Sequence, residues 1–236
     1  MLQIKEWCDE LGLSVKGVHA TMGEKNSDLK DYTSLNDYNR LAGVELVKNR
    51  VDLAYILNTD AIVLHLGMPW ERIAKEPDCL DTVLRPVYSS FDELEPYCKN
   101  RHIKLCLENG GGPVDINCLV YDALHKRYSK EFLGLCFDTG HGNLHCKENC
   151  LEYAQRYNER LYLIHIHDNH AEGDKHIIPF EGTFNWEGFA PVLARSPYQF
   201  PILIESSCKE EGDDTAWLKK AFEAGTRFAA MVEKYR

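Results

Sequence analysis

Six short runs of β-forming residues, each separated from the next by a longer stretch of helical periodicity, constrain this fold most. The runs are SVKGVHA (14–20), AIVLHLG (61–67), IKLCLEN (103–109), FLGLCFD (132–138), LYLIHIHD (161–168) and FPILIES (200–206). Between them, residues 34–58 place apolar side chains at helical spacing on one face, namely Leu41, Val44, Val47, Val51 and Ala54. A last helix is predicted at about 214–235. Alternation of this kind predicts βαβ units and a parallel sheet.

Two architectures show this alternation: an open doubly wound sheet and a closed barrel. No G-x-G-x-x-G turn follows an early strand, so the sequence lacks the fingerprint of a dinucleotide-binding open sheet. Polar residues that can bind metal instead end all six runs, and the active sites of barrels form at the carboxyl ends of their strands. We therefore predict an α/β fold, a (β/α) TIM-type barrel. No Pro/Gly/Ser-rich linker divides the chain, so one domain over residues 1–236 is expected.

The residues at the six strand ends predict a metal site. They are His19, His65, Glu108, Asp138, His165 and Glu205. With 37 acidic residues and 10 histidines among 236, such a residue occurs about once in five positions, so six of six exceeds chance. Three imidazoles and three carboxylates suit Zn²⁺, Mn²⁺ or Co²⁺ better than Ca²⁺. We expect one to three divalent ions; the alternative is a set of polar side chains hydrogen-bonded at the barrel mouth.

Two local motifs add candidates. FDTGH places His141 three residues after Asp138, in a turn that contains glycine. The segment HIHDNHAEGDKH then supplies His167, Asp168, Asp174 and His176, of which Asp174-x-His176 forms a second candidate clamp. Asp168 is our candidate for a partner that orients a ligating imidazole. Three other histidines, in helical or loop contexts, are interpreted as surface residues: His102, His125 and His145.

Composition excludes several classes of protein. The formal net charge is −10 and the pI is near 5.5, which argues against a nucleic-acid binder, because such proteins usually carry a basic face. The apolar runs are far shorter than the roughly 20 residues of a membrane span, and the first residues do not read as a signal peptide. Nine cysteines without a C-x-x-C pair favour reduced, buried thiols and a cytoplasmic location.

From residue 17 to 206 the chain resembles the xylose isomerase-like TIM-barrel superfamily, which includes sugar isomerases, sugar epimerases and endonuclease IV. The segments that match are GVHA, VLHLG, LCLENG, CFDTGH, HIHDN, DKHIIPFEGTFNW and ILIES. Two departures stand out. Phe180 replaces the glycine that many relatives carry in P-G-E-G, and six strands are recognised where the family has eight. We therefore expect a barrel that is incomplete at the N-terminus, its first two strands not seen, with an oligomer or insertion covering the gap.

The resemblance implies roles for these residues. In the epimerase branch, one metal is held by the residues that match Glu108, Asp138, His165 and Glu205. The residues that match Glu108 and Glu205 also transfer the proton, and the residue that matches His141 contacts the substrate. In the endonuclease branch, three zinc ions use these positions together with those of His19, His65, Asp174 and His176. We also assign His167 and Trp186 to substrate binding. For the aromatic side chains Trp70, Trp186 and Phe184, packing in the core or over the barrel is favoured over stacking on a sugar.

The first hypothesis for function is a metal-dependent sugar isomerase or epimerase that acts on a small sugar or hydroxy-carbonyl compound. Glu108 and Glu205 would be its acid–base pair, and the proton transfer would pass through an enediolate. One alternative is an endonuclease IV-like zinc phosphodiesterase, and another is a non-catalytic, ligand-binding barrel. The expected partners are a sugar-like small molecule and, in a homo-oligomer, further copies of the chain; no membrane or nucleic-acid partner is expected.

Overall fold

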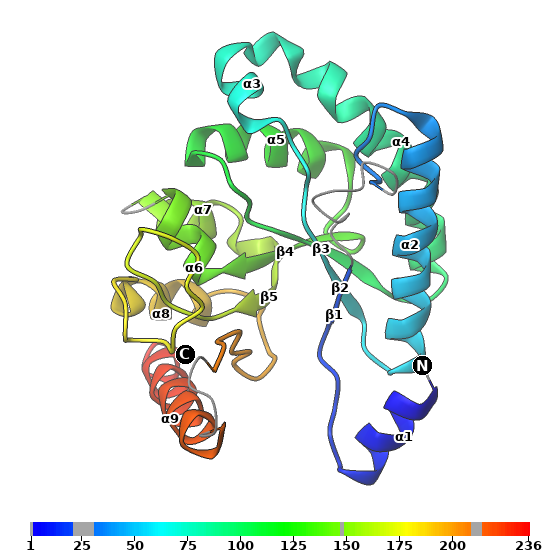
Figure 1. The fold of residues 1–236 in the computed structure, drawn as a ribbon. Coiled ribbons are helices and arrows are strands. Elements are labelled where there is room, and N and C mark those ends of the chain that lie inside the picture. Colours follow the sequence, from blue (N-terminus) through cyan, green and yellow to red (C-terminus); the bar gives the residue numbers. More distant parts are fainter. Residues whose placement is uncertain (1, 21–30, 147–148, 209–213) are drawn as a thin grey trace. The chain divides into compact units, whose positions relative to one another are not determined.

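The structure, a computed structural model, describes residues 2–20, 31–146, 149–208 and 214–236. The chain forms two compact units (Figure 1). Unit 1 comprises Met1–Glu108 and Ile116–Gly134, and unit 2 comprises Asn109–Asp115 and Leu135–Arg236.

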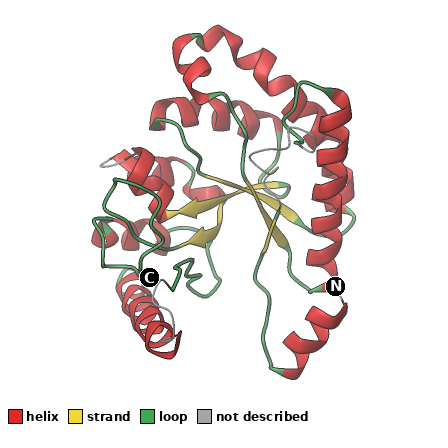
Figure 2. Ribbon diagram, viewed as in Figure 1, coloured by secondary structure: helices red, strands yellow, loops and turns green. Residues whose placement is uncertain are grey.

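Unit 1 is built on parallel strands that follow one another in chain order. β1 (Val18–His19) pairs with β2 (Ala61–Leu64), and β2 pairs with β3 (Lys104–Glu108). Figure 2 shows these strands among helices. The helices are α1 (Leu2–Glu10), α2 (Asp37–Ile56), α3 (Trp70–Lys75), η1 (Pro77–Cys79), α4 (Leu80–Lys99) and α5 (Val114–Arg127), the last of which begins in unit 2.

Helix α2 follows the predicted apolar stripe with one exception. It begins after Asn36, whose side chain accepts hydrogen bonds from two backbone N–H groups of the first turn. Val44, Val47 and Val51 are at most 2 % exposed, whereas Leu41 is 45 % exposed. A step of three residues falls 60° short of a full helical turn, so the first member of the row turns away from the buried face.

Helix α1 differs from the other long helices because it buries none of its residues. Leu2, Trp7 and, just beyond the helix, Leu11 are 70 %, 53 % and 71 % exposed. A helix of nine residues is marginal by itself in water, so its stability depends on whatever contacts this face.

Unit 2 continues the parallel pairing. β4 (Leu133–Asp138), whose first two residues belong to unit 1, pairs with β5 (Leu161–His165), with an irregularity between Leu135 and Cys136. The helices of unit 2 are α6 (Thr139–His141), the π-helical turn η2 (Gly142–Cys146), α7 (Cys150–Arg156), η4 (Asn158–Arg160), α8 (Trp186–Ala194) and α9 (Asp214–Glu233). Stacked and tilted rings fill its core, among them Phe137, Phe189 and Phe228.

The sixth predicted strand, at 200–206, is reduced to a single bridge between Ile166 and Ile204. Ile166 donates its N–H to the carbonyl of Leu203 and accepts from the N–H of Glu205, so the segment keeps a strand's direction over these residues. Pro201 has no N–H to donate, which shortens the ladder. Five strands therefore stand in the described part of the chain where six were expected.

Two further expectations concern the cysteines and membrane-spanning helices. Cys106 and Cys136, which lie within strands, are fully buried, as expected of thiols that pack as small hydrophobes. Among the residues that the structure describes, no helix has the length and apolar character needed to cross a membrane.

Candidate metal and active site

Three clusters of histidine and carboxylate side chains lie at the carboxyl ends of the strands. The first cluster, in unit 1, consists of His19, His65 and Glu108, which end or follow β1, β2 and β3. The Nε2 atoms of the two histidines are 3.1 Å apart and lie 3.5 and 3.0 Å from Oε2 of Glu108. Glu108 has only 1 % of its side chain exposed, so a nearly buried carboxylate faces two imidazoles.

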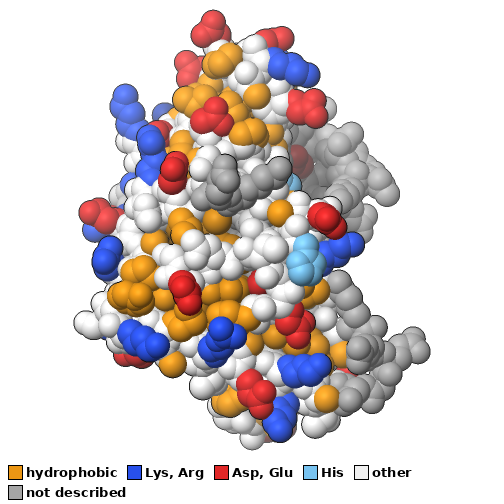
Figure 3. Space-filling view, turned by 90° about the vertical axis from the view of Figure 1, so that its left-hand side faces the viewer, with side chains coloured by type: hydrophobic (Ala, Val, Ile, Leu, Met, Phe, Trp, Pro, Cys, Tyr) orange, Lys and Arg blue, Asp and Glu red, His pale blue; other side chains and the backbone are white. Residues whose placement is uncertain are grey.

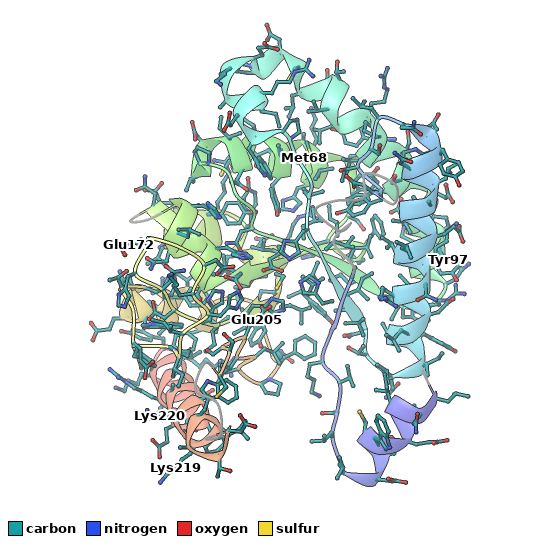
Figure 4. The ribbon with its side chains drawn as sticks, in the orientation of Figure 1. Met68, Tyr97, Glu172, Glu205, Lys219 and Lys220 are labelled. Carbon is teal, nitrogen blue, oxygen red and sulfur yellow. The ribbon has the colours of Figure 1, made fainter. Side chains whose placement is uncertain are left out.

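The second cluster, in unit 2, consists of Asp138, His165 and Glu205, and the strand register creates it. Asp138 lies opposite His165 in the β4–β5 ladder, and Glu205 donates its backbone N–H to Ile166, the residue after His165. Each of the three side chains offers one ligand atom, and these atoms lie within 4.8 Å of one another. Nδ1 of His165 is 2.6 Å from Oε2 of Glu205. Figure 4 places Glu205 beside the end of β5.

The third cluster, also in unit 2, consists of His141, Asp174 and His176. Oδ2 of Asp174 lies 3.5 Å from Nε2 of His141 and 3.1 Å from Nε2 of His176. His176 also bonds through Nδ1 to the backbone carbonyl of Glu205, at 2.7 Å, which links this cluster to the second. The loop after β5 therefore brings Asp174 and His176 close to His141, and their role as a second clamp stays a prediction.

Asp138 tests whether this chemistry fits a cation. Its side chain is completely buried, and Oδ1 accepts the N–H of His141 at 2.7 Å, which caps α6. Oδ2 is buried and accepts no hydrogen bond. A buried carboxylate oxygen without a donor is unfavourable by several kcal/mol unless a positive charge faces it. The residues present therefore fit a divalent metal, for which His and carboxylate oxygens are ordinary ligands.

His167 lies between the second and third clusters. Its Nε2 is 3.0 Å from Oδ1 of Asp138, and its ring stacks on His176 with centroids 3.9 Å apart. Burial lowers the pKa of His167, but the Asp138 carboxylate more than offsets this, and its pKa is raised above the usual value. Only glycine fits at position 140, because a Cβ there would lie 1.9 Å from Cε1 of His167.

Asp168 holds the loop between β5 and α8. It is fully buried and accepts hydrogen bonds from the backbone N–H groups of Asn169, Phe180 and Phe184 and from Nε1 of Trp186. Its role toward an imidazole stays a prediction. Trp186 is 5 % exposed and packs on aromatic rings of unit 2, and its assignment to substrate binding also stays a prediction.

Phe180, in the same loop, has a φ of 77°, which is unusual for a residue with a bulky side chain. Its ring centroid is 5.0 Å from that of Trp186, and the guanidinium of Arg227 lies over the ring at 3.9 Å. These ring contacts and the hydrogen bond to Asp168 hold the backbone in this conformation.

Sequence reasoning missed Asn109. Its amide donates to the carbonyl of Asp138 at 2.9 Å and accepts the N–H of Asp138 at 2.6 Å, which fixes the end of β4. The one sequence feature that could have indicated this role is the position of Asn109 directly after Glu108 at a strand end. His145, interpreted as a surface residue, is exposed, but its ring centroid lies 6.3 Å from that of His141. His102, likewise interpreted, is exposed as well.

Comparison with known proteins shows the family of the chain. The chain matches the family model described as xylose isomerase-like TIM barrel over residues 1–227. It is 30 % identical over 243 residues to the uncharacterized protein y4fM of Sinorhizobium fredii, covering 96 % of this chain and 78 % of that protein.

Solved structures share the fold. A D-tagatose 3-epimerase-like protein superposes with a TM-score of 0.75 at 21 % identity, over 99 % of this chain and 82 % of its own. The 3-keto-D-glucoside 4-epimerase YcjR from E. coli superposes with a TM-score of 0.71 at 17 % sequence identity. The match covers 95 % of this chain and 83 % of that one. The predicted fold class is thus confirmed. The chain belongs to the xylose isomerase-like TIM-barrel family.

Proposed function

We propose that this chain is a divalent-metal-dependent isomerase or epimerase of a small sugar or hydroxy-carbonyl compound. The observation that carries the proposal is the second cluster, where the β4–β5 register and the Glu205–Ile166 hydrogen bond bring His165 and Glu205 to the carboxylate of Asp138, whose Oδ2 is buried and accepts no hydrogen bond. Support also comes from the fold that the chain shares with a D-tagatose 3-epimerase-like protein and a 3-keto-D-glucoside 4-epimerase.

We further propose that Glu108 joins Asp138, His165 and Glu205 as the fourth ligand. Two hydrogen bonds join Asn109 to Asp138. Glu108 directly precedes Asn109 in the chain, and consecutive Cα atoms are about 3.8 Å apart. The buried position of the Glu108 carboxylate supports the same role. A metal held here would polarise the substrate's carbonyl and hydroxyl oxygens.

The acid–base steps fall to the two glutamates. Glu205, whose side chain is 41 % exposed, removes the proton from the carbon beside the substrate carbonyl, and an enediolate results. Glu108, protonated at the start of the cycle, then gives its proton to the opposite face of that carbon, which gives epimerisation. If the proton goes to the former carbonyl carbon instead, and the neighbouring hydroxyl proton passes to the former carbonyl oxygen, isomerisation results. Solvent then removes the proton from Glu205 and returns one to Glu108 before the next turnover. His141, which borders the second cluster and has 17 % of its side chain exposed, holds a substrate hydroxyl group. The side chain of His167 is fully buried beside Asp138, and its assignment to substrate binding stays a prediction.

Proton exchange with solvent tests this function. The protein is stripped with a chelator, reloaded with Mn²⁺, Co²⁺ or Zn²⁺, and incubated with D-tagatose in D₂O, and deuterium at C3 is followed by NMR. We expect exchange only in the reloaded protein. Glu205→Gln should lower the exchange rate at least about 100-fold, the lower end of what a general acid or base contributes. The matched control is Glu172→Gln, an exposed carboxylate on the outer side of the loop after β5 (Figure 4). Full activity of both Glu205→Gln and Glu108→Gln would reject the assignment.

The endonuclease IV-like alternative keeps one specific observation in its favour. All nine predicted ligands stand in the three clusters, whereas one metal needs about four. The net charge of −10 opposes it, and on the face shown in Figure 3 basic side chains are interspersed with acidic ones rather than gathered. Three zinc ions per chain by elemental analysis, with hydrolysis of bis(p-nitrophenyl) phosphate, would favour the phosphodiesterase over the epimerase.

A further inference from the structure

His145 lies one turn beyond His141, on the π-helical turn η2 that follows α6. Turns of this type occur often at functional sites, because the extra residue redirects the side chains that follow. His141 is the more enclosed of the two, with 17 % of its side chain exposed, whereas His145 is exposed to solvent. His145 therefore stands on the solvent side of the third cluster.

A turn without side chains lies against this ring. Residues 110–112 are all glycine, and they follow Asn109, whose two hydrogen bonds to Asp138 anchor the turn within unit 2. A Cβ built on Gly111 would meet Cε1 and Nε2 of His145, both at 3.7 Å. Glycine at this position therefore lets the imidazole lie beside the backbone of the turn with no side chain between them.

The side chains that influence the pKa of His145 belong to the second and third clusters. Burial is the largest influence on its pKa and lowers it, the neighbouring His141 lowers it further, and Asp174 and Asp138 partly offset them. The two ring nitrogens of an imidazole can serve as hydrogen-bond donor or acceptor. Such a ring can bond a sugar hydroxyl group in either sense.

We propose that His145 and the Gly111 turn bind the end of a polyhydroxylated substrate that is remote from the reacting carbon, and so determine the chain length that the site accepts. This inference rests on the proposed function. The substrate would extend from Asp138 past His141 to His145. Nδ1 of His141 is 3.8 Å from Oδ1 of Asp138, and the ring centroid of His145 is 6.3 Å from that of His141. A short substrate would react at the second cluster without reaching His145.

Two ketoses separate this role from a structural one. The metal-loaded protein is given D-tagatose, with six carbons, or D-erythrulose, with four, and deuterium incorporation beside the carbonyl is measured for each. His145→Ala should lower kcat/KM for D-tagatose about tenfold, the value of one lost hydrogen bond to a neutral group, and leave D-erythrulose unchanged. Metal content per chain should stay at the wild-type value.

Gly111→Ala provides a second variant with an intact imidazole. Its methyl group would make an ordinary van der Waals contact with His145, so folding and metal content are retained while the KM for D-tagatose rises. Matched controls are His102→Asn, at an exposed histidine in unit 1, and Gly173→Ala, whose Cβ would lie 3.6 Å from Lys175 Cε. Neither control should change the ratio of the two ketoses.

The outcomes separate the inference from the function beneath it. Equal losses for both ketoses in His145→Ala, or no loss for either, overturn the inference and leave the proposed function standing. Exchange of D-erythrulose alone by the wild-type protein also overturns the inference, because the longer sugar would then not be engaged. Exchange of neither ketose overturns the proposed function and the inference together.

Discussion

At the scale of single residues, the close approach of Gly140 and His167 determines how the second and third clusters meet. The missing Cβ lets the imidazole lie against the backbone of α6, within reach of Asp138. This contact makes a glycine that looks like a simple turn residue in FDTGH a requirement of the site.

Gly140→Ala should therefore disturb both stability and metal binding. Because the new methyl group must displace a buried ring, we expect a loss of about 1–3 kcal/mol in the free energy of unfolding, as for other overpacked interiors. Urea denaturation measures this loss, and elemental analysis should show fewer ions per chain. Gly173→Ala, where the added Cβ meets only the side chain of Lys175, is the control. Equal stability of the two variants would contradict the placement of His167.

The sequence could predict which histidine and carboxylate side chains gather near the strand ends, but not how they are held. Asp138 and Glu205 are visible because a strand end is a local pattern that residue type and position reveal. Asn109 and His145 are not, because their roles depend on a partner far along the chain or across a turn: Asn109 bonds a residue 29 positions away. How the three clusters divide the ligands likewise needed the register of the strands.

At the scale of elements, α1 and α4 represent opposite cases of helix stabilisation. Helix α1 buries nothing, whereas α4 buries a long apolar face that includes Phe91 at 0 % exposure. Helical periodicity predicts α2 from the sequence alone, and it places the α2 stripe correctly apart from Leu41. Periodicity shows which residues share a face; whether that face is covered depends on the rest of the fold.

Replacing one aromatic residue in each helix measures this contrast. Phe91→Ala should lower the free energy of unfolding by about 3–5 kcal/mol, the range for large-to-small changes in a core. Trp7→Ala should change it by less than about 0.5 kcal/mol, as for exposed positions. Both values follow from denaturation curves at low protein concentration. A large loss in Trp7→Ala would show that α1 is covered in solution, and light scattering would then tell whether a second copy covers it.

At the scale of the whole molecule, the acidity of the chain and its stability are linked through the clusters. Glu108, Asp138 and Glu205 at or near strand ends and Asp174 in the loop after β5 contribute four carboxylates to the clusters of a chain with net charge −10. The βα alternation predicts a parallel sheet, and the polar residues at the strand ends together with the missing G-x-G-x-x-G turn favour the barrel over the open sheet. The reduction of the sixth strand to one bridge could not be predicted, because a run of β-forming residues does not report how many ladder partners it has.

Chelation should lower the thermal stability, because a ligand that binds only the folded chain stabilises it by mass action. At a free metal concentration 100 times the Kd, the gain is about 2.7 kcal/mol, or several degrees in Tm. Scanning calorimetry with and without Zn²⁺ or Mn²⁺ measures the shift. Asp138→Asn should abolish most of it, whereas Glu172→Gln should leave it intact. An unchanged Tm across these conditions would show that the clusters hold no ion.

The left-handed backbone at Phe180 determines which residues that position can tolerate. Glycine adopts this conformation without strain, whereas a bulky residue costs about 1–3 kcal/mol, which phenylalanine offsets through its ring contacts with Trp186 and Arg227. Residues with neither advantage, such as valine or isoleucine, carry the strain without the contacts. A library of variants at this position should therefore favour two unlike residues, the smallest and an aromatic one, with those of intermediate size selected against.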